Sequence, residues 1–176
     1  MRMWFMEGAN LFVGDHDPNA SKHLTLTELQ LPTMEEMTAD HHPGGSPFAI
    51  DVPVGFEKLE ATFKLAGWDP DVLSMFGVGS RVAQSFTAYG SLRDKLTGAS
   101  MQAKAVITGR LGRAEPETFQ RGELQGHDYA IGSIIRYQLY LAGREKFYFD
   151  FATAAWRVDG KVQNADERRN LMLPTI

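Results

Sequence analysis

The most regular alternation of hydrophobic and polar residues lies in residues 54–77 and predicts a strand followed by a short helix. Leu59, Ala61, Phe63 and Leu65 alternate with polar residues. A period of two places such apolar side chains on one face of a β-strand and the polar ones on the other. The polar set consists of Lys58, Glu60, Thr62 and Lys64. We therefore expect a half-buried strand with one polar, outward face.

The residues that follow predict a short capped helix. The Asp69 carboxylate can cap the helix N-terminus, and Pro70 suits the first helical turn, where its missing N–H costs nothing. Gly77 is placed to end the helix in a left-handed conformation. The apolar residues of one helical face are Val72, Leu73 and Phe76. We expect this helix to cover one open end of the sheet, with Leu73 and Phe76 buried.

Similar alternation predicts further strands, and no strand–helix–strand rhythm is present. The segments concerned are residues 10–14, 24–31 (with a β-bulge near Thr27 and Glu28), 82–92, 101–111, 131–141 and 146–151, the last two joined as a hairpin at Gly143. Residues 114–128 are expected to form a loop, and Asn164 to cap a short C-terminal helix. This pattern predicts a mainly β protein, an antiparallel sandwich or barrel with one short flanking helix. Residues 1–176 are predicted to form a single domain.

A long segment, residues 34–54, shows only weak alternation. Pro43, Gly44, Gly45 and Pro47 prevent a continuous strand, and loops of this length are uncommon unless they are functional. We expect this segment to project as an extended hairpin or loop that buries its apolar residues in a neighbouring copy. The predicted contact residues are Met34, Asp40, His41, His42, Gly44, Gly45, Phe48, Ile50 and Val52 in the loop, with Trp4, Phe5, Leu171 and Leu173 near the chain ends.

Composition narrows the classes of function. Eighteen basic and 22 acidic residues give a net charge of −4, so the chain lacks the basic surplus of proteins that bind nucleic acid through its phosphates. With no cysteine, disulfides and thiolate metal sites are excluded. We find no secretory signal pattern and no apolar run of membrane-spanning length, so we expect no association with a membrane.

Few residues suggest catalysis or metal binding. His41 and His42, beside Asp40, form a metal cluster only if they converge with His16 and its acidic neighbours, but adjacent residues of an extended loop point to opposite sides. A solvated loop is the simpler reading. The chain has no Gly-x-Ser-x-Gly nucleophile elbow and no phosphate-binding glycine loop. We therefore predict no catalytic residues, no metal, no cofactor and no enzymatic activity.

Several segments, in this order, resemble the FII-type major tail tube proteins of contractile-tailed bacteriophages. The closest correspondence is at residues 55–61 and 67–77, and residues 10–13, 29–32 and the hairpin through residues 136–151 are similar to other parts of the family pattern. The chain departs from that pattern at residues 15–23, 41–43 and 114–127. Phage, prophage and bacteriocin-like particles all remain open.

The resemblance implies a structural protein whose copies form hexameric rings. The rings stack into a tube inside a contractile sheath, and DNA or an effector passes along the bore without sequence-specific binding. The implied partners are further copies of the chain, the sheath protein, and the baseplate and tail terminator proteins, in a virion assembled in the host cytoplasm. We expect the polar set Lys58, Glu60, Thr62 and Lys64 to face the lumen. The alternatives are a type VI secretion-like tube protein and, from another class, a ligand-binding or metal-dependent β-barrel.

Overall fold

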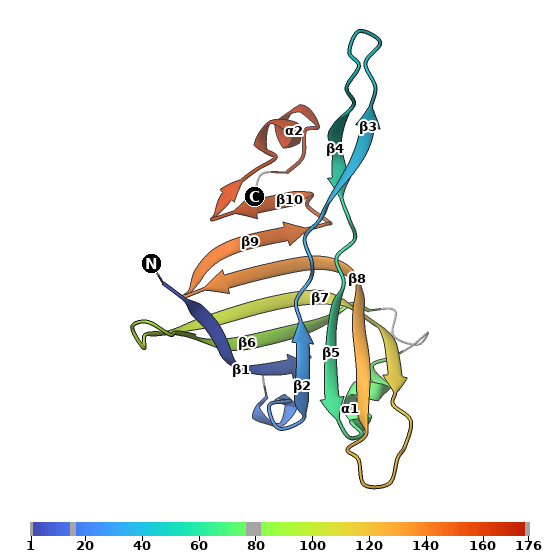
Figure 1. Cartoon of the computed structure of the whole chain (residues 1–176), viewed down its shortest axis with the longest axis vertical. Helices are drawn as coiled ribbons and strands as arrows, with labels where there is room; N and C mark the ends of the chain where they lie inside the picture. Colours follow the sequence, from blue (N-terminus) through green and yellow to red (C-terminus); the bar gives the residue numbers. More distant parts are fainter. Residues whose placement is uncertain (1, 15–16, 77–81, 175–176) are drawn as a thin grey trace.

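Two long, bent strands organise the computed structural model, which describes residues 2–14, 17–76 and 82–174 (Figure 1). These strands are β7 and β8, and they take part in both of the sheets described below. The elements are β1 (Trp4–Val13), η1 (Pro18–Ala20), β2 (Leu26–Gln30), β3 (Glu36–His41), β4 (Ile50–Phe56), β5 (Ala61–Ala66), α1 (Pro70–Ser74), β6 (Gln84–Asp94), β7 (Ser100–Pro116), β8 (Gly126–Leu141), β9 (Arg144–Asp150), β10 (Ala155–Val158), β11 (Lys161–Val162) and α2 (Ala165–Asn170).

The two halves of β7 and β8 belong to different layers. The parts of β7 and β8 far from the turn that joins them, residues 100–109 and 136–141, pair with β6 and β9. They belong to a sheet with the strand order β1-β6-β7-β8-β9-β10-β11, which we name the large sheet. Residues 110–116 and 126–132 pair with each other, and β8 also pairs there with β5, which in turn pairs with β2. We name this second layer, β2-β5-β8-β7, the small sheet. All of these pairings are antiparallel.

The bend occurs where the backbones of β7 and β8 approach each other most closely. Register shifts interrupt their pairing between Thr108 and Arg110 and again between Leu111 and Arg113, and Ser133 has a positive φ of 47°. A Cβ atom on Gly109 would lie 2.9 Å from the carbonyl oxygen of Gly132. Only glycine permits this approach, so Gly109 allows the two strands to turn together from one sheet into the other.

The core fills the space between the two sheets. On β5 the side chains of Ala61, Phe63 and Leu65 are buried and those between them are not, which confirms the predicted alternation. Phe63 stacks on Tyr129 of β8 with ring centroids 5.0 Å apart. The other buried apolar residues of this cluster are Leu11, Val13, Val72, Phe86, Ala88, Ala105, Ile107, Leu111, Ile131 and Tyr137.

Helix α1 begins as the sequence predicts. Asp69 is the N-cap and accepts a hydrogen bond from the Val72 backbone N–H at 3.1 Å, and its other carboxylate oxygen lies 2.7 Å from the Lys22 ammonium. Pro70 occupies the first helical turn. The predicted cap at Gly77 lies outside the described residues.

The buried face of α1 differs from the prediction. Val72 is fully buried and Leu73 packs against the core at partial exposure, but Phe76 is 47% exposed, so its predicted burial is wrong. The helix ends at Ser74, with Met75 as its C-cap, and Phe76 therefore lies beyond the last helical turn. Helical spacing consequently does not direct its ring toward the core.

The predicted bulge and hairpin are confirmed, and one predicted loop is shorter than expected. The bulge in β2 is confirmed as a register shift between Leu26 and Glu28, and the hairpin of β8 and β9 turns at Gly143. The loop predicted for residues 114–128 is too long, because β7 continues to Pro116 and β8 begins at Gly126. The mainly β, antiparallel class is confirmed. The described residues form the flanking helix α1 and also the expected C-terminal helix, α2, whose N-cap is Asn164 but without a side-chain capping hydrogen bond.

The packing of α1 leads to a prediction for one substitution in the helix and one just beyond its end. Val72→Ala removes buried methyl groups and should lower the free energy of unfolding by about 2 kcal/mol. Phe76→Ala removes a half-exposed ring and should cost less than about 1 kcal/mol, as surface substitutions usually do. Urea unfolding followed by circular dichroism measures both, and a larger loss for Phe76→Ala would show that its ring is buried in solution.

Candidate assembly surfaces

A two-stranded ribbon, formed by β3, β4 and the tip between them, extends away from the two sheets (Figure 1). Its strands pair only with each other, from Glu36 opposite Phe56 to His41 opposite Ile50. The chain enters the ribbon after β2 and returns from it into β5, so the ribbon extends from one end of the small sheet. Six of the β4 residues and all of β3 are exposed. The segment expected to project thus does so as a hairpin.

The two faces of the ribbon differ in chemistry. Directly paired residues share a face, so Val52 lies with Ala39 and Ile50 with His41, while Asp40 and Asp51 lie opposite each other on the second face. Phe48, at the tip, is 76% exposed. One face is therefore largely apolar and exposed, and the other is acidic.

The excess of acidic over basic residues lies in the segment that contains the ribbon, residues 33–57. Residues 33–57 contain no lysine or arginine, whereas the rest of the chain holds 18 basic and 17 acidic residues. The acids of the segment are Glu35, Glu36, Asp40, Asp51 and Glu57. The negative net charge of the chain thus resides in the ribbon. At the ribbon base, the Phe56 ring packs edge-on against Trp156 of β10, with centroids 4.6 Å apart, and this contact ties the ribbon to the large sheet.

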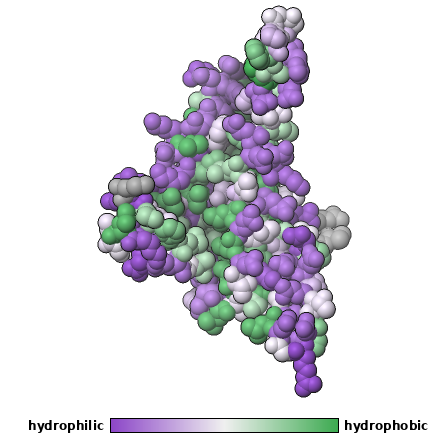
Figure 2. All heavy atoms as spheres, viewed as in Figure 1, coloured by the Kyte–Doolittle hydropathy of each residue, from purple (hydrophilic) through white to green (hydrophobic). Residues whose placement is uncertain are grey.

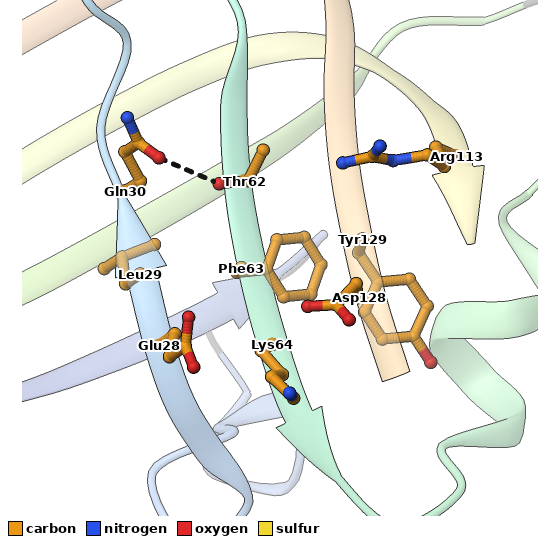
Figure 3. A pocket seen from close by; sticks show the side chains of 9 residues that line it. All are labelled: Glu28, Leu29, Gln30, Thr62, Phe63, Lys64, Arg113, Asp128 and Tyr129. Carbon is orange, nitrogen blue, oxygen red and sulfur yellow. Dashed lines mark hydrogen bonds between the residues drawn. The ribbon is translucent and has the colours of Figure 1, made fainter. Parts of the chain in front are cut away.

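The outward face of the small sheet is mainly polar. Thr62 and Lys64 lie on this face of β5, and the Thr62 hydroxyl donates a hydrogen bond to Gln30 at 3.4 Å. A shallow cavity of about 180 Å³ lies here (Figure 3). Its polar lining residues are Glu28, Gln30, Thr62, Lys64, Arg113 and Asp128. The other two lumen candidates, Lys58 and Glu60, are exposed and precede β5.

One ion pair on this face has perturbed protonation equilibria. The Lys64 ammonium donates to the Glu117 carboxylate, which also accepts the backbone N–H of Gly126 at 2.7 Å. The Lys64 hydrogen bond, and then that of Gly126, lower the pKa of Glu117. The same bond to Glu117 raises the pKa of Lys64. The pair joins β5 to the segment that follows β7.

The small sheet has two open edges. On one side β2 pairs with β5, and no other described strand adds to its free edge. On the other side, residues 110–116 of β7 pair with β8 alone among the described strands, because the described pairing of β6 with β7 ends at Gly109. Open edges present unpaired backbone N–H and C=O groups, which readily accept a strand from another chain.

The chain ends are only partly covered. Trp4 and Leu173 are half-buried, whereas Phe5 and Leu171 are exposed. Near the C-terminus, the buried Arg168 guanidinium donates to the carbonyl oxygens of Thr153 and Pro174, which holds the tail against the β9–β10 turn. The predicted contact residues therefore lie on separate surfaces, the ribbon and the two ends of the chain.

The histidines do not form a metal centre in the part of the chain that the structure describes. His41 and His42 are exposed on the ribbon, and no three His, Asp or Glu side chains converge there or elsewhere in that part. Asp15 and His16, which the sequence suggested as their partners, lie outside the described residues. The described helices are all too short to cross a membrane.

Comparisons with known proteins agree with this architecture. The family model for the phage tail tube protein FII matches residues 6–171. The fold is similar to a chain of the PVC sheath–tube complex of an extracellular contractile injection system in its extended state, with a TM-score of 0.54, 9% identity, and 76% of this chain and 88% of that chain covered. A chain of the PVC sheath/tube terminator gives a TM-score of 0.52 and 9% identity over 77% of this chain and 93% of the other. No individually characterised protein sequence matches.

The Lys64–Glu117 pair predicts a measurable pH dependence of stability. A carboxylate with a lowered pKa stabilises the fold above its unfolded pKa, about 4.3 for Glu, and this contribution is lost as the pH falls through the folded value. Glu117→Gln should therefore reduce the free energy of unfolding at pH 7 and flatten its decline below about pH 4. Glu123→Gln, on the same loop, is the control. Equal acid profiles for Glu117→Gln and the unmodified chain would show that the pair contributes nothing.

Proposed function

Because this chain belongs to the phage tail tube protein FII family, we propose that its copies form hexameric rings that stack into the tube of a contractile tail. The observation that carries this proposal is the pair of open edges of the small sheet. The β2, β5, β8 and β7 strands alternate in direction, so the two edge strands, β2 and β7, run in opposite directions. Copies placed side by side around an axis then join β2 to β7 as an antiparallel pair.

Ring closure follows from the same geometry. Each copy contributes an even number of strands to the small sheet, so antiparallel pairing continues across every junction between copies. A closed barrel has no free edges, which removes the unpaired backbone groups that each isolated copy exposes. The large sheet lies outside this barrel, where it is available to the surrounding sheath.

The outward face of the small sheet then lines the bore. This assignment includes the predicted lumen residues Lys58, Glu60, Thr62 and Lys64. In the four strands and the start of the adjoining loop the face carries four acids, Glu28, Glu115, Glu117 and Asp128, and three bases, Lys64, Arg110 and Arg113. Lys58 and Glu60 add one charge of each sign. A polar wall with an acidic excess binds phosphate weakly, so DNA passes without being retained and without sequence-specific contacts.

The ribbon and the chain ends supply the contacts between rings and with other tail proteins. An apolar face that stays exposed on one copy is typical of a protein interface. The similar structures come from a sheath–tube complex and from a sheath/tube terminator of a contractile injection system. By analogy, we assign a sheath protein, a baseplate and a terminator as partners of this chain. The protein is a component of a phage or phage-like particle, and its role in the tube requires no catalysis or cofactor.

Cysteine labelling tests the lumen assignment, because the chain has no native cysteine. Glu60→Cys is expected to react with a maleimide carrying a bulky polymer in unassembled protein and to be protected in tubes, because the polymer cannot enter the bore. Gln102→Cys, exposed on the outward face of the large sheet, is the control and should stay reactive in both states. Labelling of assembled Glu60→Cys at the rate of Gln102→Cys would contradict the assignment.

Deletion of residues 41–47 tests the role of the ribbon. The deletion removes the tip but none of the two sheets, so the far-ultraviolet circular dichroism and thermal unfolding should remain close to those of the full chain. Stacked tubes should be lost, as seen by negative-stain electron microscopy. Normal tubes from the deletion variant would show that the tip is not a contact surface, and an unfolded variant would show that the segment belongs to the core.

A further inference from the structure

The chain order gives the small sheet two different poles. The ribbon is inserted between the end of β2 and the start of β5, so it leaves from one pole. The opposite pole holds the start of β2, the end of β5, the start of β8 and the end of β7, together with α1 and the loop of residues 117–125. Figure 1 shows the ribbon and this loop at the two ends of the longest axis.

The pole opposite the ribbon exposes large apolar side chains, which we name the pole patch. Its members are Leu24 (86% exposed), Trp68 (64%), Phe119 (74%) and Leu124 (91%). Contacts between their neighbours hold the segments together: Ala66 donates to the Thr25 carbonyl at 2.7 Å, and Gly67 to the Gln125 carbonyl at 2.7 Å. In the hydropathy view, hydrophobic residues lie near both ends of the molecule (Figure 2).

Trp68 is held in place although most of its surface is exposed. Its indole N–H donates to the Gln125 side chain at 3.2 Å, and its ring meets the His127 ring edge-on, with centroids 4.3 Å apart. His127 is fully buried and donates from Nδ1 to the Gly67 carbonyl at 3.0 Å, so it forms a fixed support. A fixed, exposed aromatic side chain loses little conformational entropy on binding, which is the property of interface hot spots.

We propose that the pole patch, with Trp68 as its anchor, receives the apolar face of the ribbon from a copy in the next ring. This inference rests on the proposed function. In a tube, each copy repeats along the axis, so the upper surface of one ring must meet the lower surface of the next. A ribbon at one pole and an apolar patch at the other form a heterologous contact, which extends into an open stack instead of closing.

The charges of the two surfaces favour the ribbon as the partner of the pole patch. The ribbon segment has five acids and no lysine or arginine. Arg121, in the loop of the pole patch, forms no ion pair with any described residue and offers a cation to the acidic face of an arriving ribbon, so that the pole carries charges of both signs: Arg121 beside Glu123 of the same loop and Asp71 of α1. A second ribbon, by contrast, offers only further acids. The pole patch is thus the better partner for the ribbon in both its apolar and its charged groups.

Trp68→Ala tests the inference in the full-length protein. Rings of this variant should form as in the unmodified chain, while the protein concentration needed for stacking should rise at least about tenfold, the effect typical of a hot-spot residue. Trp68→Phe keeps an aromatic ring and should retain part of the stacking. Leu96→Ala removes an equally exposed side chain from the β6–β7 hairpin and should stack normally. Sedimentation and negative-stain microscopy measure rings and stacks separately.

Cross-linking keeps the test independent of stability. Cysteines beside the contact residues leave the ribbon and the pole patch intact: tubes assembled from Ala49→Cys and Gln120→Cys chains should give mixed dimers with a short bismaleimide, whereas Ala49→Cys with Leu96→Cys should not. Unchanged stacking of Trp68→Ala, or cross-linking of only the control pair, would overturn the inference and leave the proposed function intact. Absence of rings and tubes from the unmodified chain would overturn the proposed function, and the inference with it.

Discussion

The whole architecture depends on the unbroken pairing of β7 with β8 through a bend. If these two strands ended at the bend, the two sheets would be separate layers joined only by loops. Instead, one pair of strands supplies Ile107 to the core from the large sheet and Leu111 from the small one. The close approach of Gly109 to Gly132 is the local requirement, because a larger side chain at Gly109 would collide with the facing carbonyl. The bend thus fixes the angle between the small sheet and the large sheet.

In the proposed tube, the polarity of the assembly follows from the position at which the ribbon is inserted in the chain, between β2 and β5. An insertion between β2 and β5 can leave the small sheet from only one end, since both connections lie there. An isolated two-stranded ribbon is marginally stable in water, and here it is fixed to the body through Phe56 and Trp156. Its tip has no such support within the described chain. Contact with the next copy would therefore order the tip at the same step that extends the tube.

Local patterns in the sequence predicted those features whose causes are local. Alternation on β5, the Asp69 cap and the bulge in β2 depend on neighbouring residues, and all three agree with the structure. Features set by distant partners were not predictable. Asp150 is the last residue of β9 and a polar position in its alternation with Phe147 and Phe149, yet it is buried, and its carboxylate accepts hydrogen bonds from the Arg136 guanidinium and the Thr153 backbone N–H.

The residues of the candidate assembly surfaces also differ in whether the sequence alone could predict them. Exposed apolar residues in the ribbon could be predicted from composition, because a segment with proline and glycine cannot bury them locally. Trp68 was visible only as an aromatic residue at the end of a strand pattern. Its support by His127 and Gln125, which follow 59 and 57 residues later, requires the pairing of β5 with β8. No short-range signal in the sequence contains that information.

The acidic residues of the ribbon disfavour contact between two ribbons. An exposed apolar hairpin invites association with a second copy of itself, which would produce closed dimers in place of a tube. Asp40 and Asp51 face each other across the strands, an arrangement that weakens the ribbon itself. In the proposed stack, the same pair repels another ribbon, which carries only acids, more strongly than it repels a pole that carries Arg121 as well as Glu123 and Asp71. The cost of placing two carboxylates together is thus compensated by specificity: ribbon–ribbon pairing is disfavoured, and head-to-tail contact remains.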